Sequence, residues 1–159
     1  MQIQKYYSTL IWCSIALIIG LKRHFGIFAF VFACVLLFSI VKFIKHAIFK
    51  DNEKKQSFIN VVFWSLSLVI IITKHTVVHF QVRDIADSIS DQVLYYYSEH
   101  GDYPPDLESL TVNKKDLDKI DVFYTRDKSE AYLMYLVTWT IRDLYKFNFK
   151  TKKWDYLSP

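Results

Sequence analysis

The fold of this chain is decided by residues 58–105, which read FINVVFWSLSLVIIITKHTVVHFQVRDIADSISDQVLYYYSEHGDYPP. The stretch begins as an apolar run from Phe58 to Thr73 and continues, with no Gly or Pro in between, into an amphipathic segment from Val82 to Tyr97. Gly101 and the pair Pro104-Pro105 are the first residues in it that stop a helix. We therefore expect one long helix that is apolar on all sides at first and then has one face to bury.

The amphipathic segment has a regular apolar face. Its members recur at steps of three and four residues and are Val82, Ile85, Ala86, Ile89, Val93 and Tyr96 or Tyr97. Asp84, Asp87, Asp91 and Ser98 line the opposite face. This spacing predicts a helix that packs one side against another element.

The residues after the helix change to a strand pattern. Four short runs of alternating or apolar residues are separated by polar turns, at 122–125, 131–137, 145–150 and 154–157. Before them, Asp106 to Leu110 has the spacing of one helical turn that buries Leu107 and Leu110. Four antiparallel strands with an apolar face need a cover, which the amphipathic helix can supply. The expected fold class is therefore α+β.

Two further apolar runs precede the long helix, from Tyr6 to Leu21 and from Ile27 to Ile44. A bilayer core is spanned by roughly 20 apolar residues, and flanking Tyr and Lys side chains extend such runs. A signal peptide is the alternative for the first run, but Gly20-Leu21-Lys22-Arg23 lacks a small-x-small cleavage pattern. We expect an α+β membrane protein with three transmembrane helices, at about 6–21, 27–44 and 58–73. The expected domains are 1–80 in the membrane and 81–159 outside it.

The charge is divided unevenly between these halves. Residues 1–80 hold nine Lys and Arg against two acids, and residues 81–159 hold eleven against fourteen. Lys45, Lys50, Lys54 and Lys55 place a positive loop between the second and third runs. The positive-inside rule then predicts a cytoplasmic N-terminus and a periplasmic C-terminal domain in a bacterial inner membrane. Positive charge concentrated outside the soluble half argues against nucleic-acid binding.

No catalytic signature is present: GxSxG, HExxH, CxxC and a glycine-rich phosphate loop are all missing, and the chain has only 3 Gly. We expect a non-enzyme without a cofactor. His75 and His79 stand four residues apart on one helix face, but a metal site needs a third ligand, so no metal is expected. Cys13 and Cys34 lie in apolar runs and read as small apolar fillers.

Three groups of residues are candidates for contacts. Asp84, Asp87 and Asp91 form a carboxylate stripe, either simply solvated or facing a basic partner. The lysines of 145–154 alternate with aromatic residues, which a sheet with one buried face explains better than single-strand nucleic-acid binding. In the third apolar run, the candidate face for another membrane helix is formed by Val61, Trp64, Leu68 and Ile71.

The chain also carries a motif that resembles a known family. After Tyr97 come Gly101-x-Tyr103-Pro104-x-x-Leu107-x-x-Leu110 and then strands. This order resembles type IV pilins and the pseudopilins of type II secretion over roughly residues 58–159, and it implies a pilin-like helix packed on a small antiparallel sheet. Pilins also have a cleaved leader and a Glu near the start of the mature helix. The run from Phe58 has neither, and Gly26 is followed at the fifth position by Val31, so prepilin cleavage is not expected.

A multi-span anchor with a pilin-like outer domain is similar to the accessory proteins of some type IV pili. The resemblance implies a membrane-anchored protein of fimbrium biogenesis that engages pilin subunits and modulates pilus assembly or retraction. The alternative is an immunity protein that protects the inner membrane against a pore-forming bacteriocin or membrane-acting toxin. Expected partners are thus the lipid bilayer and a pilin or a toxin, with no nucleic acid; the sequence does not define an oligomeric state.

Overall fold

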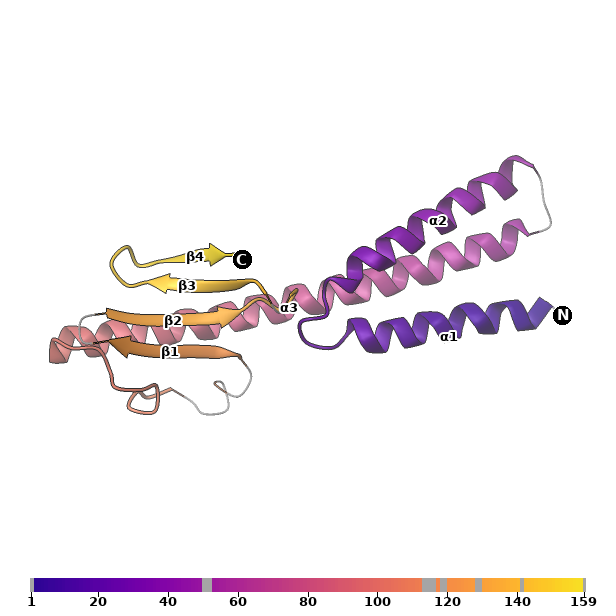
Figure 1. The fold of residues 1–159 in the computed structure, drawn as a ribbon. Helices are drawn as coiled ribbons and strands as arrows, with labels where there is room; N and C mark the ends of the chain where they lie inside the picture. The colour runs from indigo at the N-terminus through magenta and orange to yellow at the C-terminus, as the bar shows by residue number, and fades with distance from the viewer. Residues whose placement is uncertain are drawn as a thin grey trace. The chain divides into compact units, whose positions relative to one another are not determined.

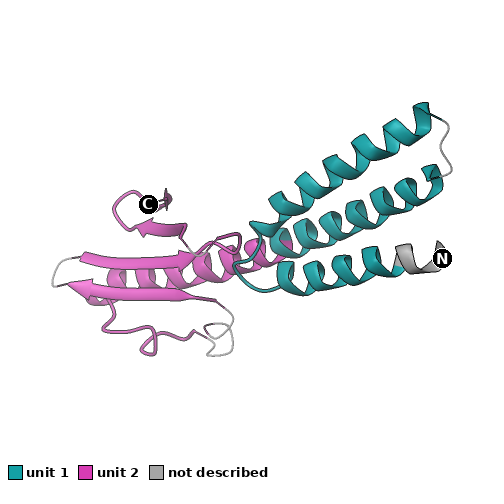
Figure 2. Ribbon diagram, turned by 45° about the vertical axis from the view of Figure 1, so that its right-hand side comes forward, with its two compact units in different colours: residues 1–76 teal, residues 77–159 magenta. Residues whose placement is uncertain are grey.

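The computed structural model describes residues 2–49, 53–112, 117, 120–127, 130–140 and 142–158, with side chains from residue 7 onward. It contains three helices followed by four strands (Figure 1). Their bounds are α1 Gln2–Gly20, α2 Phe28–Ile48, α3 Lys54–His100, β1 Val122–Asp127, β2 Glu130–Leu136, β3 Leu144–Asn148 and β4 Lys153–Leu157. The chain divides into two compact units, residues 1–76 and 77–159, and α3 contributes to both (Figure 2). The expected α+β class is confirmed.

Two of the helices are long and apolar enough to cross a membrane. They are α2, of 21 residues, and α3, of 47 residues, with mean hydropathies of 2.3 and 1.9 in their most apolar windows. The apolar part of α1, Tyr7–Gly20, is shorter than a span requires by length alone. By length and composition, two of the three expected membrane helices therefore qualify.

In the first unit, α1 contacts α3 near Thr9 and again at Gly20. The hydroxyl of Thr9 donates to the side-chain oxygen of Asn60 at 3.1 Å, and Gly20 lies against the fully buried Ile71. A Cβ at Gly20 would stand 2.6 Å from Ile71 Cδ1, so only glycine permits this approach without a shift. From α2, Phe32 meets Trp64 edge-on, with ring centroids 5.4 Å apart.

The C-terminal end of α1 is capped by side chains of α3. His75 Nε2 lies 2.8 Å from the carbonyl oxygen of Gly20, and Lys74 Nζ donates to the carbonyl oxygen of Leu21. The last carbonyls of a helix have no partner within the helix, and leaving them unsatisfied away from water is costly. Lys74 and His75 of α3 therefore supply hydrogen-bond partners for the last carbonyl groups of α1.

In the second unit, the strands form an antiparallel meander of order β1-β2-β3-β4, with α3 covering one face (Figure 1). The helix contributes Val82, Ala86, Ile89 and Val93, all at most 2% exposed. The sheet meets them with Leu133, Tyr135 and Phe147. Burial of each such apolar side chain contributes roughly 1.5–3 kcal/mol, so this shared core holds the helix to the sheet.

The helix ends as its sequence predicts. α3 stops at His100, and Gly101 follows with φ of 71°, its N–H donating to the carbonyl oxygen of Tyr97 at 2.9 Å. The single turn expected at 106–110 is closed by a hydrogen bond from the N–H of Leu110 to the carbonyl oxygen of Leu107, at 3.3 Å. The Asp106 carboxylate accepts the N–H of Ser109 at 2.8 Å, and Leu107 and Leu110 pack against the core.

One strand also ends earlier than expected. β3 stops at Asn148 because the Asn148 side-chain oxygen accepts the N–H groups of Lys150 and Thr151, each at 3.1 Å. Phe149 therefore lies in the turn and not in the strand, although it is buried as the alternating pattern predicts.

Candidate interaction site

The polar contact between α3 and the sheet is built around Arg83. Its Nε lies 3.2 Å from Asp87 Oδ2, one helical turn further along α3. The other carboxylate oxygen of Asp87 accepts the indole N–H of Trp154 in β4, at 2.5 Å. Asp87 thus links Arg83, on the same helix, to Trp154 in the edge strand β4.

Aromatic rings surround the Arg83 guanidinium. Its carbon lies 5.0 Å from the Trp154 ring centroid and 5.6 Å from that of Tyr145. One of its terminal nitrogens donates to the Tyr135 hydroxyl at 3.4 Å. Burial raises the pKa of Tyr135. The arrangement satisfies a half-buried cation with a carboxylate, a phenol and two rings, so it stabilises the contact between α3 and the sheet.

The expected carboxylate stripe is divided by this contact. Asp84 and Asp91 are exposed on α3, whereas Asp87 is half-buried and occupied by Arg83 and Trp154. Helical spacing alone could not distinguish them, because Trp154 is 67 residues away in sequence. Contact of the exposed pair with a basic partner stays a prediction.

The candidate membrane face of α3 is largely occupied by contacts with α1 and α2. Ile71 is buried against Gly20, Trp64 packs on Phe32, and Val61 and Leu68 are half-buried. A partner contact there stays a prediction. A second apolar stripe on α3 is 46–58% exposed and was not singled out from the sequence: Phe58, Val62, Leu66 and Val69. Their spacing of three and four residues is the signal that defines one helix face.

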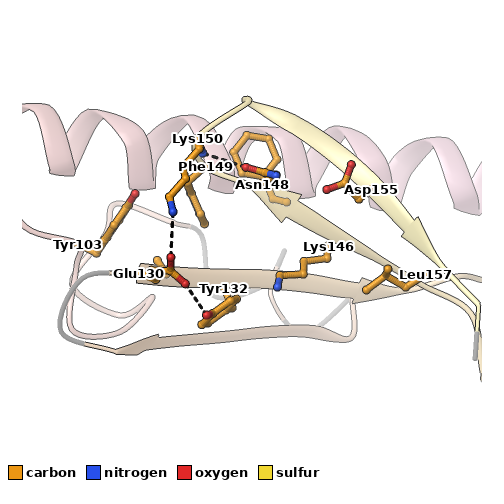
Figure 3. A pocket seen from close by; sticks show the side chains of 11 residues that line it. Tyr103, Glu130, Tyr132, Lys146, Asn148, Phe149, Lys150, Asp155 and Leu157 are labelled. Carbon is orange, nitrogen blue, oxygen red and sulfur yellow. Dashed lines mark hydrogen bonds and ion pairs between the residues drawn. The ribbon is translucent and has the colours of Figure 1, made fainter.

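A shallow pocket of about 340 Å³ lies on the sheet face opposite α3 (Figure 3). Across its rim, the Lys150 ammonium is 3.0 Å from the Glu130 carboxylate, which also accepts the Tyr132 hydroxyl at 2.7 Å. These hydrogen bonds lower the pKa of Glu130, that from Tyr132 most. Lys146 Nζ stands 4.2 Å from the Tyr132 ring centroid. Glu130 therefore already has Lys150 and Tyr132 as partners at this rim.

The two helix histidines take separate roles. His75 caps α1, as described above, and the His79 ring lies 6.1 Å from that of Tyr145. Burial, with the nearby positive charge of Arg83, lowers the pKa of His79. Among the described residues, no group of three or more His, Cys, Asp or Glu side chains is placed to hold a metal ion. Cys13 is buried and Cys34 exposed, and both are free thiols.

The residues of the Gly-x-Tyr-Pro motif form the cap at the end of α3. Tyr103 stacks on Tyr97 with ring centroids 4.5 Å apart, and Pro104 is fully buried. The carbonyl oxygen of Pro104 accepts the Tyr124 hydroxyl at 2.8 Å, which ties the segment to β1. The motif therefore fixes where the chain leaves the helix and approaches the sheet.

These features define an α+β protein in which one helix carries both an apolar candidate span and the packing face for a sheet. Comparison with protein families, curated proteins and solved structures finds no match to this chain.

Proposed function

We propose that the protein is a membrane-anchored, non-enzymatic accessory protein of a type IV pilus, which engages pilin subunits and modulates their assembly or removal. The observation that carries the proposal is the uninterrupted helix α3, Lys54–His100. A continuous helix that leaves the membrane and packs on a small meander is the arrangement by which pilin subunits are built. A protein of this form can lie beside a membrane-embedded pilin with matching parts at matching depth.

The proposed contact is made by the exposed stripe of α3, not by the half-buried face around Ile71. Val62, Leu66 and Val69 are 46–58% exposed, and Phe58, at the start of the stripe, is 53% exposed although its ring also meets that of Phe43 in α2, with centroids 5.8 Å apart. In lipid, helices associate through close packing of side chains, since apolar surface alone gives little preference for protein over lipid. The exposed carboxylates of Asp84 and Asp91 would then orient a basic partner surface outside the membrane.

The proposal places the chain in a bacterial inner membrane, with the N-terminus cytoplasmic and residues 81–159 periplasmic. The lysine-rich segment between the second and third apolar runs supports this orientation.

The test is photocrosslinking in intact membranes of the native host. A photoreactive residue replaces Leu66 of α3 or Ser88 of the exposed helix face in the full chain. Ser67 is unsuitable, because it is 3% exposed and its hydroxyl donates to the Phe63 carbonyl oxygen. The matched control is Ile18 of α1, which is 66% exposed against 56% for Leu66. We expect a pilin to be captured from Leu66 and not from Ile18.

An immunity protein against a membrane-acting toxin is the second candidate. It is favoured by the apolar exposure of α1 and α2, where Trp12 is 62% and Phe38 83% exposed, because a pilin-type anchor needs only one span. Capture of a toxin from Ile18 or Phe38, with no pilin captured from Leu66, would replace the pilus proposal with this one.

A further inference from the structure

The sheet has two open edges. In the order β1-β2-β3-β4 the edge strands are β1 and β4. Within the described part of the chain, their backbone hydrogen bonds run only to the neighbouring strand of the same sheet. The segment before the sheet reaches β1 through side chains, since Tyr124 and Arg126 donate to the carbonyl oxygens of Pro104 and Tyr103. An open edge presents unpaired N–H and C=O groups to which another strand can be added.

The side chains of the two edges match when β1 is placed antiparallel to β4 of another copy. Two registers cover every residue of β4, and the one that keeps each face of the sheet continuous sets Phe123 opposite Leu157, which are 54% and 44% exposed. It sets the acidic Asp127 opposite the basic Lys153, with Thr125 opposite Asp155 between them. On the other face it sets Tyr124 opposite Tyr156. Apolar, aromatic and opposite-charge pairs across strands each stabilise pairing.

Pairing of β4 with β4 of another copy does not give this match. Full antiparallel overlap of two such strands sets Asp155 opposite Asp155, and like charges directly opposite destabilise a sheet. The rotation that relates the two copies also reverses the direction of every strand and of α3 in the second copy. Two proteins anchored through α3 in one membrane cannot have opposite directions.

Pairing of β1 with β4 keeps all copies in the same direction. Strands alternate in an antiparallel meander, so β1 and β4 of one chain run in opposite directions and a shifted copy continues the alternation. The strands run alongside α3 in the second unit (Figures 1 and 2). Each added copy is therefore displaced across the strands, in a direction roughly perpendicular to the axis of α3. A heterologous contact of this kind leaves an open edge on each side and can be repeated.

We propose that copies of this chain associate side by side through edge-to-edge pairing of β1 with β4, in the register of Phe123 opposite Leu157. The inference rests on the proposed membrane anchoring, which supplies the common direction of the copies. It is independent of the pilin contact, since that contact uses α3 and this one uses the sheet.

The experiment is disulfide crosslinking of full-length chains in native membranes, with Cys13 and Cys34 replaced by Ala. One copy carries Phe123→Cys and the other Leu157→Cys, each with a different tag, and the two are expressed together. Opposed strand residues have Cα atoms about 4.5–5.5 Å apart, within the 4.4–6.8 Å of disulfides. We expect dimers that carry both tags and few that carry one tag twice.

A chain with both substitutions is expected to form a ladder of dimers, trimers and larger species. It cannot close a bridge within itself, because β1 and β4 are three strand spacings, or about 14 Å, apart. The control pair Thr125→Cys with Leu157→Cys is displaced by two residues and is expected to crosslink several-fold less. Dimers carrying one tag twice, or mixed dimers no more abundant than in this control, would overturn the proposal.

A charge exchange tests the register separately. Lys153→Asp places two acids opposite each other and is expected to reduce the mixed dimer roughly two- to fivefold. Adding Asp127→Lys should restore it, and failure to do so would show that these residues are not opposed. Capture of a pilin from Leu66 with no mixed dimer would reject the strand pairing alone. Mixed dimers with no captured pilin would reject the pilus proposal alone.

Discussion

Asp87 has a role that its neighbours on α3 do not share. It accepts the indole N–H of Trp154 and pairs with Arg83, while Asp91 remains exposed. We expect Asp87→Asn to lower the free energy of unfolding by about 1–2 kcal/mol, because hydrogen bonds to a charged acceptor are lost at a half-exposed site. Asp91→Asn is the matched control and should change it by less than about 0.5 kcal/mol. Thermal unfolding of the full chain in detergent measures both; equal effects would mean that the stripe acts as one surface.

The phenol of Tyr124 makes the free energy of unfolding depend on pH in the alkaline range. Burial is the main cause that raises its pKa to about 12 from the ordinary 10.0. Below pH 10 the phenol is neutral in both the folded and the unfolded chain. Between pH 10 and 12 the unfolded chain releases this proton and the folded chain keeps it, so stability falls as the pH rises.

We therefore expect Tyr124→Phe to lose less stability than the native chain between pH 10 and 12. At neutral pH the same variant should be less stable by about 1 kcal/mol, because the hydrogen bond to the Pro104 carbonyl oxygen is lost. Chemical denaturation at a series of pH values measures both effects. Tyr95→Phe, at a ring that is 68% exposed, is the control. An unchanged alkaline slope in Tyr124→Phe would contradict the assignment.

At the scale of elements, the contact of α1 with α3 depends on one glycine. A Cβ at Gly20 would overlap Ile71 Cδ1, whose side chain is fully buried and has little room to move. We expect Gly20→Ala to destabilise the full chain by about 1–3 kcal/mol. Ile71→Val removes the overlapping atom, so the double variant should recover part of the loss, with a coupling of about 1 kcal/mol. Unfolding in detergent gives all four stabilities; purely additive effects would place the two residues out of contact.

Periodicity predicts the elements because it reports which side of each is buried. The apolar steps from Val82 to Val93 identify the face of α3, and the alternation around Phe147 identifies β3. A local side-chain hydrogen bond changed the end of one strand, because Asn148 ends β3 before Phe149. The pairing of Asp87 with Trp154 could not be predicted, since the sequence pattern of α3 carries no information about a partner 67 residues away.

At the scale of the whole molecule, the first unit bears on how many times the chain crosses a membrane. Thr9 contacts Asn60 and Gly20 contacts Ile71, so at both points a residue of α1 meets the residue 51 positions later in α3. The constant offset means that α1 runs parallel to α3 and at the same level as its most apolar part. α1 has 19 residues and is therefore about 28 Å long, close to the ~30 Å of a bilayer core.

This arrangement predicts that α1 crosses the membrane although its apolar part is short. Three crossings place the N-terminus and residues 81–159 on opposite sides, whereas two would place them on the same side. We expect a cysteine added before Met1, or at Lys55, to react with an impermeant maleimide only after the inner membrane is opened. Thr111→Cys should react in intact spheroplasts, with Cys13 and Cys34 replaced by Ala in every variant. Labelling of the N-terminal cysteine and of Thr111→Cys from the same side would mean that α1 does not cross.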